Sequence, residues 1–96
     1  MNDKQISSLA ALLKSISHPY RLKIVCLLQD REMTVGEISQ TINTTDANIS
    51  QHLSILRLQG ITGTRKQSNY IYNRIVDDRF IKLIETMQDL FCATEE

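Results

Sequence analysis

The most reactive side chains in this 96-residue chain are the thiols of its two cysteines, Cys26 and Cys92. Neither cysteine belongs to a CxxC or CxC motif, so the sequence predicts no metal site made by neighbouring thiols. Cys26 falls within an apolar segment, where a cysteine usually serves as a small buried side chain. Cys92 falls at the end of the last predicted helix. The two residues by themselves leave an inert pair and a reactive pair of thiols both open.

Catalysis is not indicated by any other set of residues. The sequence has no glycine-rich phosphate loop, no nucleophile with a nearby general base, and no acidic cluster outside its C-terminal tail. We therefore expect that the protein is not an enzyme and needs no cofactor.

A second group of chemically informative residues lies in the middle of the chain. On a helix over residues 46–59 Ile49, Leu53 and Leu56 share the inward face, and the N-terminal half of the opposite face presents small and amide side chains. Asparagine and glutamine can form two hydrogen bonds with adenine, and serine can bond a base or a phosphate. Basic side chains and the first amides of a helix suit phosphate. The predicted DNA contacts are Thr44, Thr45, Asn48, Ser50, Gln51, His52, Ser54, Arg65, Lys66 and Asn69.

Each of these residues taken singly also has a simpler explanation. A lone polar side chain is more often part of a solvated face, and Arg65 and Lys66 fit a solvated turn equally well. His52 lies about 60° from the inward direction of its helix, where it either seals the edge of the core or touches a phosphate. Asp46 repels phosphate, so we expect it to serve the start of its helix.

The elements that position these residues follow from the spacing of apolar side chains. Helical spacing predicts helices over residues 4–16, 20–29, 34–42, 46–59 and 77–92. Thr34 and Glu37 have the spacing of a capping box, and Gly60 suits the end of the fourth helix. After residue 60 the pattern changes from helical spacing to a period of two residues, which is typical of strands. It predicts strands over residues 61–64 and 70–75, with a polar tip at 65–69.

Four helices, a hairpin and a fifth helix, in this order, predict a mainly α winged helix-turn-helix domain over residues 1–96. The helix-turn-helix covers about residues 34–60 and the wing about 61–75. The helices at 4–16 and 77–92 carry broad apolar stripes on a chain with a thin core, so we expect them to form a homodimer interface. A dimer places two recognition helices about one helical turn apart, which suits a pseudo-palindromic operator in double-stranded DNA.

Charge and composition are compatible with this fold. Residues 46–76 hold four basic residues against one acidic residue, net +3, and residues 77–96 hold two against six, net −4. A basic middle with an acidic tail fits DNA binding through the middle. The longest apolar runs have five residues, far below the roughly 20 of a membrane span. Because the first residues also have no signal-peptide pattern, we expect a cytoplasmic protein with no membrane partner.

Three stretches resemble the ArsR/SmtB family of winged-helix repressors. Residues 13–24 are similar to the family pattern LxALxxPxRLxIL, residues 50–57 (SQHLSILR) to SQHLxxLR, and residues 64–72 to the wing pattern xRxxGxxxxY. The resemblance spans residues 12–92 and implies a dimeric DNA-binding repressor. The metal-sensing patterns of the family are absent, because the third predicted helix has no CxC motif and the last has no histidine. No metal ligand is therefore expected.

The chain is also similar to the thiol-sensing, SqrR/BigR/HlyU-like branch of that family, which carries one cysteine in the second helix and one at the end of the last. Cys26 and Cys92 match these positions and lie 66 residues apart. The resemblance implies a dithiol that senses reactive sulfur species or oxidants and releases DNA when it is bridged. Departures from the branch are Arg31, Asp46 and Ser68-Asn69. Asn69 tolerates a left-handed turn, so we expect the hairpin to be kept.

Two alternatives remain open. The first is a winged-helix regulator or anti-silencer with inert thiols and no switch. The second is a protein-interaction module that uses the wing surface for a partner. DNA binding that weakens steeply with salt distinguishes the regulators from the interaction module.

Overall fold

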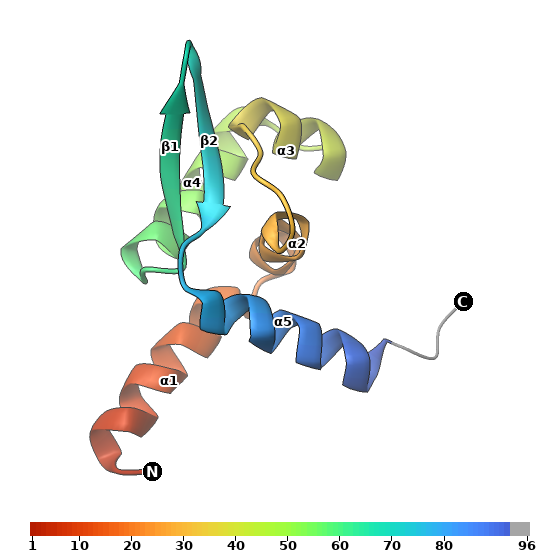
Figure 1. Cartoon of the computed structure of the whole chain (residues 1–96). Helices are drawn as coiled ribbons and strands as arrows, with labels where there is room; N and C mark the ends of the chain where they lie inside the picture. Colours follow the sequence, from red (N-terminus) through yellow and green to blue (C-terminus); the bar gives the residue numbers. More distant parts are fainter. Residues whose placement is uncertain (93–96) are drawn as a thin grey trace.

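The computed structural model describes residues 1–92. It contains helices α1 (Asp3–Ile16), α2 (Pro19–Leu28), α3 (Val35–Ile42) and α4 (Asp46–Leu58), strands β1 (Thr62–Gln67) and β2 (Tyr70–Ile75), and helix α5 (Asp78–Phe91) (Figure 1). This order confirms the predicted winged helix-turn-helix. The predicted first residue of the last helix, Asp77, is its N-cap, and the predicted last residue, Cys92, is its C-cap.

Local signals start and end the helices where the sequence predicted. The Thr34 hydroxyl accepts the Glu37 amide at 3.1 Å and the Glu37 carboxylate accepts the Thr34 amide at 2.9 Å, so the predicted capping box is present. At the start of α2 the His18 ring accepts the Tyr20 amide at 3.2 Å, with Pro19 in the first helical position. Gly60 follows α4 with φ of 75°, a left-handed conformation that glycine adopts without a steric cost.

The core forms around α2, which Figure 1 shows nearly end-on between α3, α5 and the hairpin. Ile24, Val25 and Leu28 of α2 are buried, and they meet the inward side chains of the other elements. The remaining fully buried large side chains are Ile38, Ile49, Leu53, Leu56, Ile61 and Ile84. α2 is not buried on every side, because Leu22 is 41% exposed.

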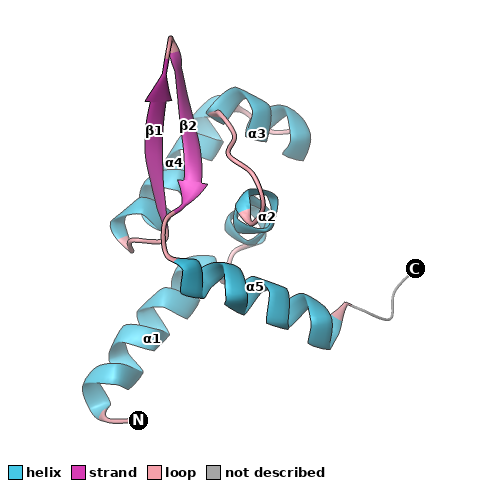
Figure 2. Ribbon diagram, in the orientation of Figure 1, coloured by secondary structure: helices cyan, strands magenta, loops and turns pink. Residues whose placement is uncertain are grey.

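The hairpin differs from its prediction at the tip. β1 extends to Gln67 and pairs antiparallel with β2, so the connection has two residues rather than five (Figure 2). Arg65 and Lys66 therefore lie inside a strand, not in a loop. The left-handed turn residue is Ser68, with φ of 56°, rather than Asn69. The strand is longer than expected because β1 forms ladder hydrogen bonds along its full length, which outweigh the weak strand preference of Arg65, Lys66 and Gln67.

A third short segment extends the sheet. Met33, between α2 and α3, exchanges backbone hydrogen bonds with Asn73 of β2, with distances of 3.1 and 2.7 Å. The buried side-chain amide of Asn73 donates a further hydrogen bond to the Met33 carbonyl at 3.2 Å. The loop that precedes α3 is therefore fixed to the wing.

Both terminal helices leave apolar side chains exposed. Ile6, Leu9 and Leu13 on α1 are 39 to 48% exposed, and Leu90 and Phe91 on α5 are more than 70% exposed. Figure 1 shows that α1 and α5 project from the body of the molecule on the side away from the hairpin. Among the residues described, no helix is long and apolar enough to span a membrane.

The packing of α4 predicts different effects for two of its leucines. Leu56 is fully buried and Leu58 is 85% exposed. We expect Leu56→Ala to lower the free energy of unfolding by about 2–5 kcal/mol, because it leaves a cavity. We expect Leu58→Ala to change it by less than about 0.5 kcal/mol. Urea unfolding at one fixed protein concentration measures both, and equal losses would contradict the inward face assigned to α4.

Candidate DNA-reading surface and thiol pair

The turn between α3 and α4 is held by side chains at both of its ends. Asn43 ends α3 in a left-handed conformation with φ of 69°. The buried Ser39 hydroxyl donates a 2.5 Å hydrogen bond to the Asp46 carboxylate in the first turn of α4. The Thr45 hydroxyl caps α4 by accepting the Asn48 amide at 3.1 Å. Asp46 thus serves the helix start, as expected, and these bonds fix the angle between the two helices.

The outward face of α4 carries four of the ten predicted contacts. Gln51 and Ser50 are exposed, and the Asn48 side-chain amide donates to the Thr44 hydroxyl at 3.0 Å. Ser54 is half-buried, and its hydroxyl donates to the Ser50 carbonyl at 3.0 Å. Because Asn48 already has an internal partner, Gln51 is the amide side chain best placed to read a base edge.

A cleft of about 350 Å³ separates α4 from the hairpin. Ser50, Ser54 and Arg57 line it from α4, and Thr64 lines it from β1. The Arg57 guanidinium donates to the Ser54 hydroxyl at 3.3 Å. Arg57 and Thr64 were not among the predicted contacts. The position of Arg57 three residues after Ser54, on the same side of the helix, was the signal available in the sequence.

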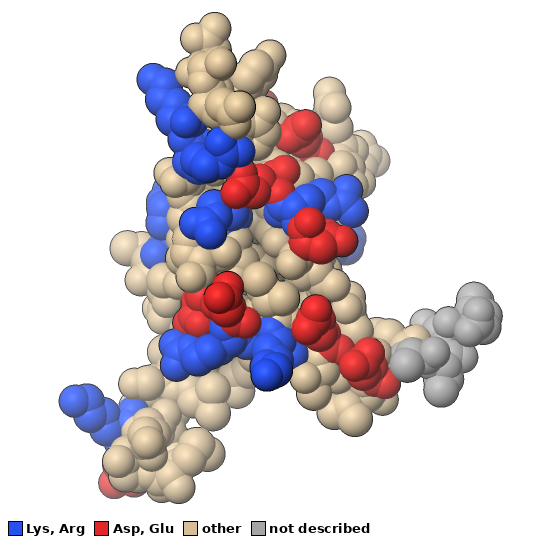
Figure 3. Space-filling model, in the orientation of Figure 1, with Lys and Arg blue, Asp and Glu red and all other residues tan. Residues whose placement is uncertain are grey.

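The two predicted basic residues of the wing have different surroundings. Lys66 pairs with Ile71, and Thr64 pairs with Asn73. Because Thr64, Ile71 and Asn73 line the cleft beside α4, Lys66 lies on the sheet face that turns toward α4. Within residues 1–92 no carboxylate lies within salt-bridge distance of Lys66. Arg65 points to the other face, where its Nη2 lies 2.6 Å from the Glu32 carboxylate. Figure 3 shows acidic side chains set among basic ones over this part of the molecule.

His52 faces α2 rather than the outer surface. Its ring lies 4.5 Å from the His18 ring and 5.6 Å from the Tyr20 ring, between centroids. Its Nδ1 lies 3.1 Å from Nη1 of Arg21. Burial lowers the pKa of His52, and His18 and Arg21 lower it further. A neutral, half-buried imidazole favours sealing of the core edge over contact with a phosphate.

The two cysteines lie near one another at the opposite end of α2. Cys26 is half-buried and Cys92 is exposed. The side-chain amide of Gln29 donates to the Gln88 side-chain oxygen at 3.2 Å, which joins α2 to α5. Gln29 is three residues after Cys26, and Gln88 is four residues before Cys92. At these spacings each cysteine lies on the same side of its helix as the neighbouring glutamine.

Electrostatics agree with this placement. Burial raises the pKa of the Cys26 thiol, and the negative charge of a Cys92 thiolate raises it further. A charge affects a second group in this way only when the two are close. Both effects favour the protonated form of the Cys26 thiol.

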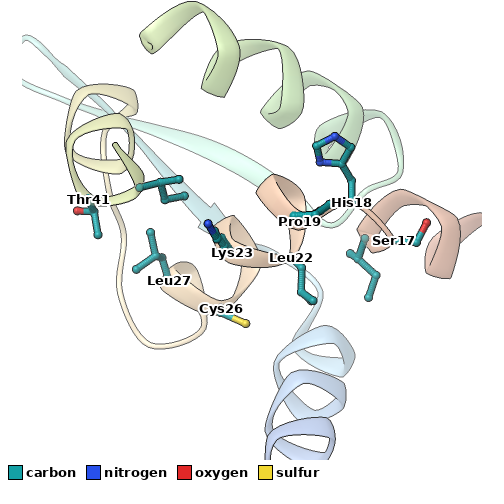
Figure 4. Close-up of a pocket in the computed structure, with 10 residues that line it drawn as sticks. Ser17, His18, Pro19, Leu22, Lys23, Cys26, Leu27 and Thr41 are labelled. Atoms are coloured by element: carbon teal, nitrogen blue, oxygen red, sulfur yellow. The ribbon is translucent and has the colours of Figure 1, made fainter. Parts of the chain in front are cut away.

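Cys26 also borders an open groove of about 840 Å³. Its walls are mainly apolar and come from the end of α1, from α2 and from the end of α3 (Figure 4). The Cys26 sulfur and the Lys23 side chain lie on α2 along this groove. In the part of the chain that the structure describes, no group of three histidine, cysteine or acidic side chains could hold a metal ion.

Sequence comparisons place the chain among bacterial regulators. Residues 18–61 match the family described as "Bacterial regulatory protein, arsR family". The biofilm growth-associated repressor of Agrobacterium fabrum is 37% identical over 94 residues, which cover 98% of this chain and 80% of that protein. The transcriptional activator HlyU of Vibrio cholerae is 31% identical over 94 residues, covering 98% of this chain and 87% of that protein.

Solved structures give the same assignment. HlyU from Vibrio cholerae superposes with a TM-score of 0.89 at 32% identity, covering 95% of this chain and 99% of that chain. The transcriptional repressor BigR from Xylella fastidiosa superposes with a TM-score of 0.86 at 37% identity, covering 96% and 94%. The chain therefore belongs to the ArsR family of bacterial regulatory proteins and is a winged helix-turn-helix transcriptional regulator.

Proposed function

We propose that the protein is a homodimeric repressor that reads a pseudo-palindromic DNA operator with α4 and releases it when Cys26 and Cys92 are bridged. The observation that most directly supports the switch is the hydrogen bond between the Gln29 and Gln88 side chains, which joins the end of α2, near Cys26, to the last turn of α5, which Cys92 caps.

Dimerisation through α1 and α5 is supported by their exposed apolar side chains. Ile6, Leu9 and Leu13 form one stripe on α1, and Leu90 and Phe91 extend the apolar surface on α5. Exposed apolar patches of this kind mark association surfaces, because their burial removes them from water. A two-fold dimer would present two copies of α4 to successive turns of a DNA duplex.

A charge placed in this stripe tests the dimer. We expect the wild-type protein to sediment as a dimer at micromolar concentration. Ile6→Glu should weaken the dimer at least tenfold, because the interface would bury an unpaired carboxylate. Ser7→Glu adds the same charge at a neighbouring exposed position and should leave the dimer intact. A monomeric wild-type protein would refute the interface.

DNA reading is assigned to α4 and the wing. Gln51 would contact base edges in the major groove, with Ser50 and Ser54 beside it and Thr44, Thr45 and Asn48 at the end of the helix nearest a phosphate. Lys66 and Arg57 would contact the backbone on the hairpin side. Asn69 at the hairpin tip is placed to approach the adjacent minor groove.

Two substitutions separate base reading from phosphate binding. Gln51→Ala should weaken binding to a duplex selected from a random pool by about 1–3 kcal/mol and relax its sequence preference. Lys66→Ala should weaken binding to all duplexes alike and reduce the slope of log affinity against log salt by about 0.9. Both follow from titrations at several salt concentrations. Unchanged specificity in Gln51→Ala would contradict the assigned outer face.

The proposed switch is a sulfur exchange between the two thiols and a persulfide. The exposed Cys92 thiolate attacks the outer sulfur of R–S–SH, which forms a protein persulfide and expels R–S⁻. The Cys26 thiol then loses its proton and attacks that persulfide, which closes the Cys26–Cys92 disulfide and releases HS⁻. In sum, two thiols and R–S–SH give one disulfide, R–SH and H₂S. Inserted sulfurs would make a longer bridge with looser geometric limits.

The bridge would act on DNA through α5. A covalent link between α2 and the end of α5 changes the position of a helix that also forms the proposed dimer interface. A small change there alters the spacing of the two recognition helices, and DNA selects that spacing. A coupling of about 1.4–2.8 kcal/mol corresponds to a ten- to hundredfold loss of affinity.

Serine variants test the switch. Cys26→Ser and Cys92→Ser should bind DNA as tightly as the reduced wild-type protein and keep this affinity after treatment with glutathione persulfide. Cys92→Ser should also fail to take up sulfur from the persulfide, because the remaining thiol is half-buried. Release of DNA from both variants under persulfide would refute the thiol switch and favour a regulator with inert cysteines.

Binding that does not depend on salt would favour the protein-interaction module.

A further inference from the structure

We propose that Glu32 restrains the DNA affinity of the wing by holding Arg65 and Arg74 in an internal ion pair. This inference rests on the proposed DNA-binding function. Glu32 lies outside the recognition helix and outside the hairpin, in the loop between α2 and α3.

The backbone places Glu32 on the same sheet face as the two arginines. Met33 pairs with Asn73 at the free edge of β2, and its side chain is buried. Because successive side chains in an extended segment point to opposite faces, Glu32 points to the outer face. Arg65 pairs with Tyr72, and Arg74 pairs with Gly63, so both arginines lie on that face too.

Each of the three nitrogens of the Arg65 guanidinium lies within hydrogen-bond distance of one partner. Its Nε and Nη2 lie 2.7 and 2.6 Å from the same Glu32 oxygen, Oε1. Its Nη1 donates to the Gln67 side chain at 2.6 Å. The guanidinium carbon lies 5.1 Å from the centroid of the Tyr72 ring, so the group extends across the sheet and packs on that ring. The second Glu32 oxygen lies 3.4 Å from Nε of Arg74.

A DNA phosphate would compete with Glu32 for the Nε and Nη2 donors of Arg65. Carboxylate and phosphate both bind the planar fork of arginine through two parallel hydrogen bonds. While Glu32 holds Arg65, the two arginines and the carboxylate together present a net charge of +1 instead of +2. The wing then binds fewer phosphates than its sequence suggests, and Lys66 remains its available cation on the opposite face.

The ion pair is partly exposed, with side-chain exposures of 44% for Arg65 and 32% for Glu32. Solvent weakens such pairs, so their contribution to folding stability is small. Loss of the Glu32 charge should therefore leave the fold intact and change the DNA interaction. Affinity for DNA, rather than stability, is the informative readout.

The test compares Glu32→Gln with Asp30→Asn on one 30-base-pair duplex of random sequence. Asp30 lies in the same loop, but its carboxylate is 3.5 Å from Arg31 and does not contact the hairpin arginines. We expect Glu32→Gln to bind about five- to tenfold more tightly, with a salt slope steeper by about 0.9 for each additional phosphate that the freed arginines neutralise. Asp30→Asn should change affinity less than twofold. Arg65→Ala alone should have little effect, and the double variant Glu32→Gln/Arg65→Ala should lose most of the increase in affinity.

Three results would overturn the inference. Unchanged or weaker binding by Glu32→Gln would mean that the carboxylate does not withhold the arginines. An equal increase in Asp30→Asn would mean that any lost negative charge has this effect. An increase that survives in the double variant would exclude Arg65 as its source. If the wild-type protein itself showed no salt-dependent binding, the proposed function would fail, and this inference with it.

Discussion

The burial of α2 is the constraint on which the other features depend. Its inward side chains Ile24, Val25 and Leu28 pack at the centre of the core, so the helix cannot move without disturbing its neighbours. Each functional region is attached to a different part of it. His18, Tyr20 and Arg21 at its start contact His52 of α4. Gln29 at its end contacts α5, and the loop that follows is fixed to the wing through Met33.

This arrangement gives a physical basis for coupling the thiols to DNA. Cys26 belongs to the packed helix, whereas Cys92 caps a helix whose last apolar side chains, Leu90 and Phe91, are exposed. A bridge between them would move the end of α5 more readily than α2, because α2 is held by the core and the last turn of α5 is exposed. Under the proposed function, the movable helix is also the one that sets the distance between the two recognition helices of a dimer.

The sequence predicted the features that depend on local chemistry. The capping box at Thr34, the left-handed Gly60 after α4, and the inward face of Ile49, Leu53 and Leu56 all follow from spacing within one or two turns. The fold and the family followed from the same patterns. Contacts between distant segments were not predictable from spacing. Glu32 and Arg65 are 33 residues apart, and no pattern in the chain indicates that they meet on one sheet face. The hairpin tip was misplaced because its polar residues suggested a loop, and ladder hydrogen bonds kept them in the strand.

The central claim is that bridging of Cys26 and Cys92 lowers affinity for DNA through the structure that joins them. The most direct measurement treats reduced wild-type protein with glutathione persulfide, then records its intact mass and its DNA affinity on the same sample. The proposed switch predicts one intramolecular bridge per protomer, seen as the loss of two hydrogens plus the mass of any inserted sulfur atoms, together with a ten- to hundredfold loss of affinity. Complete bridging with unchanged affinity would contradict it.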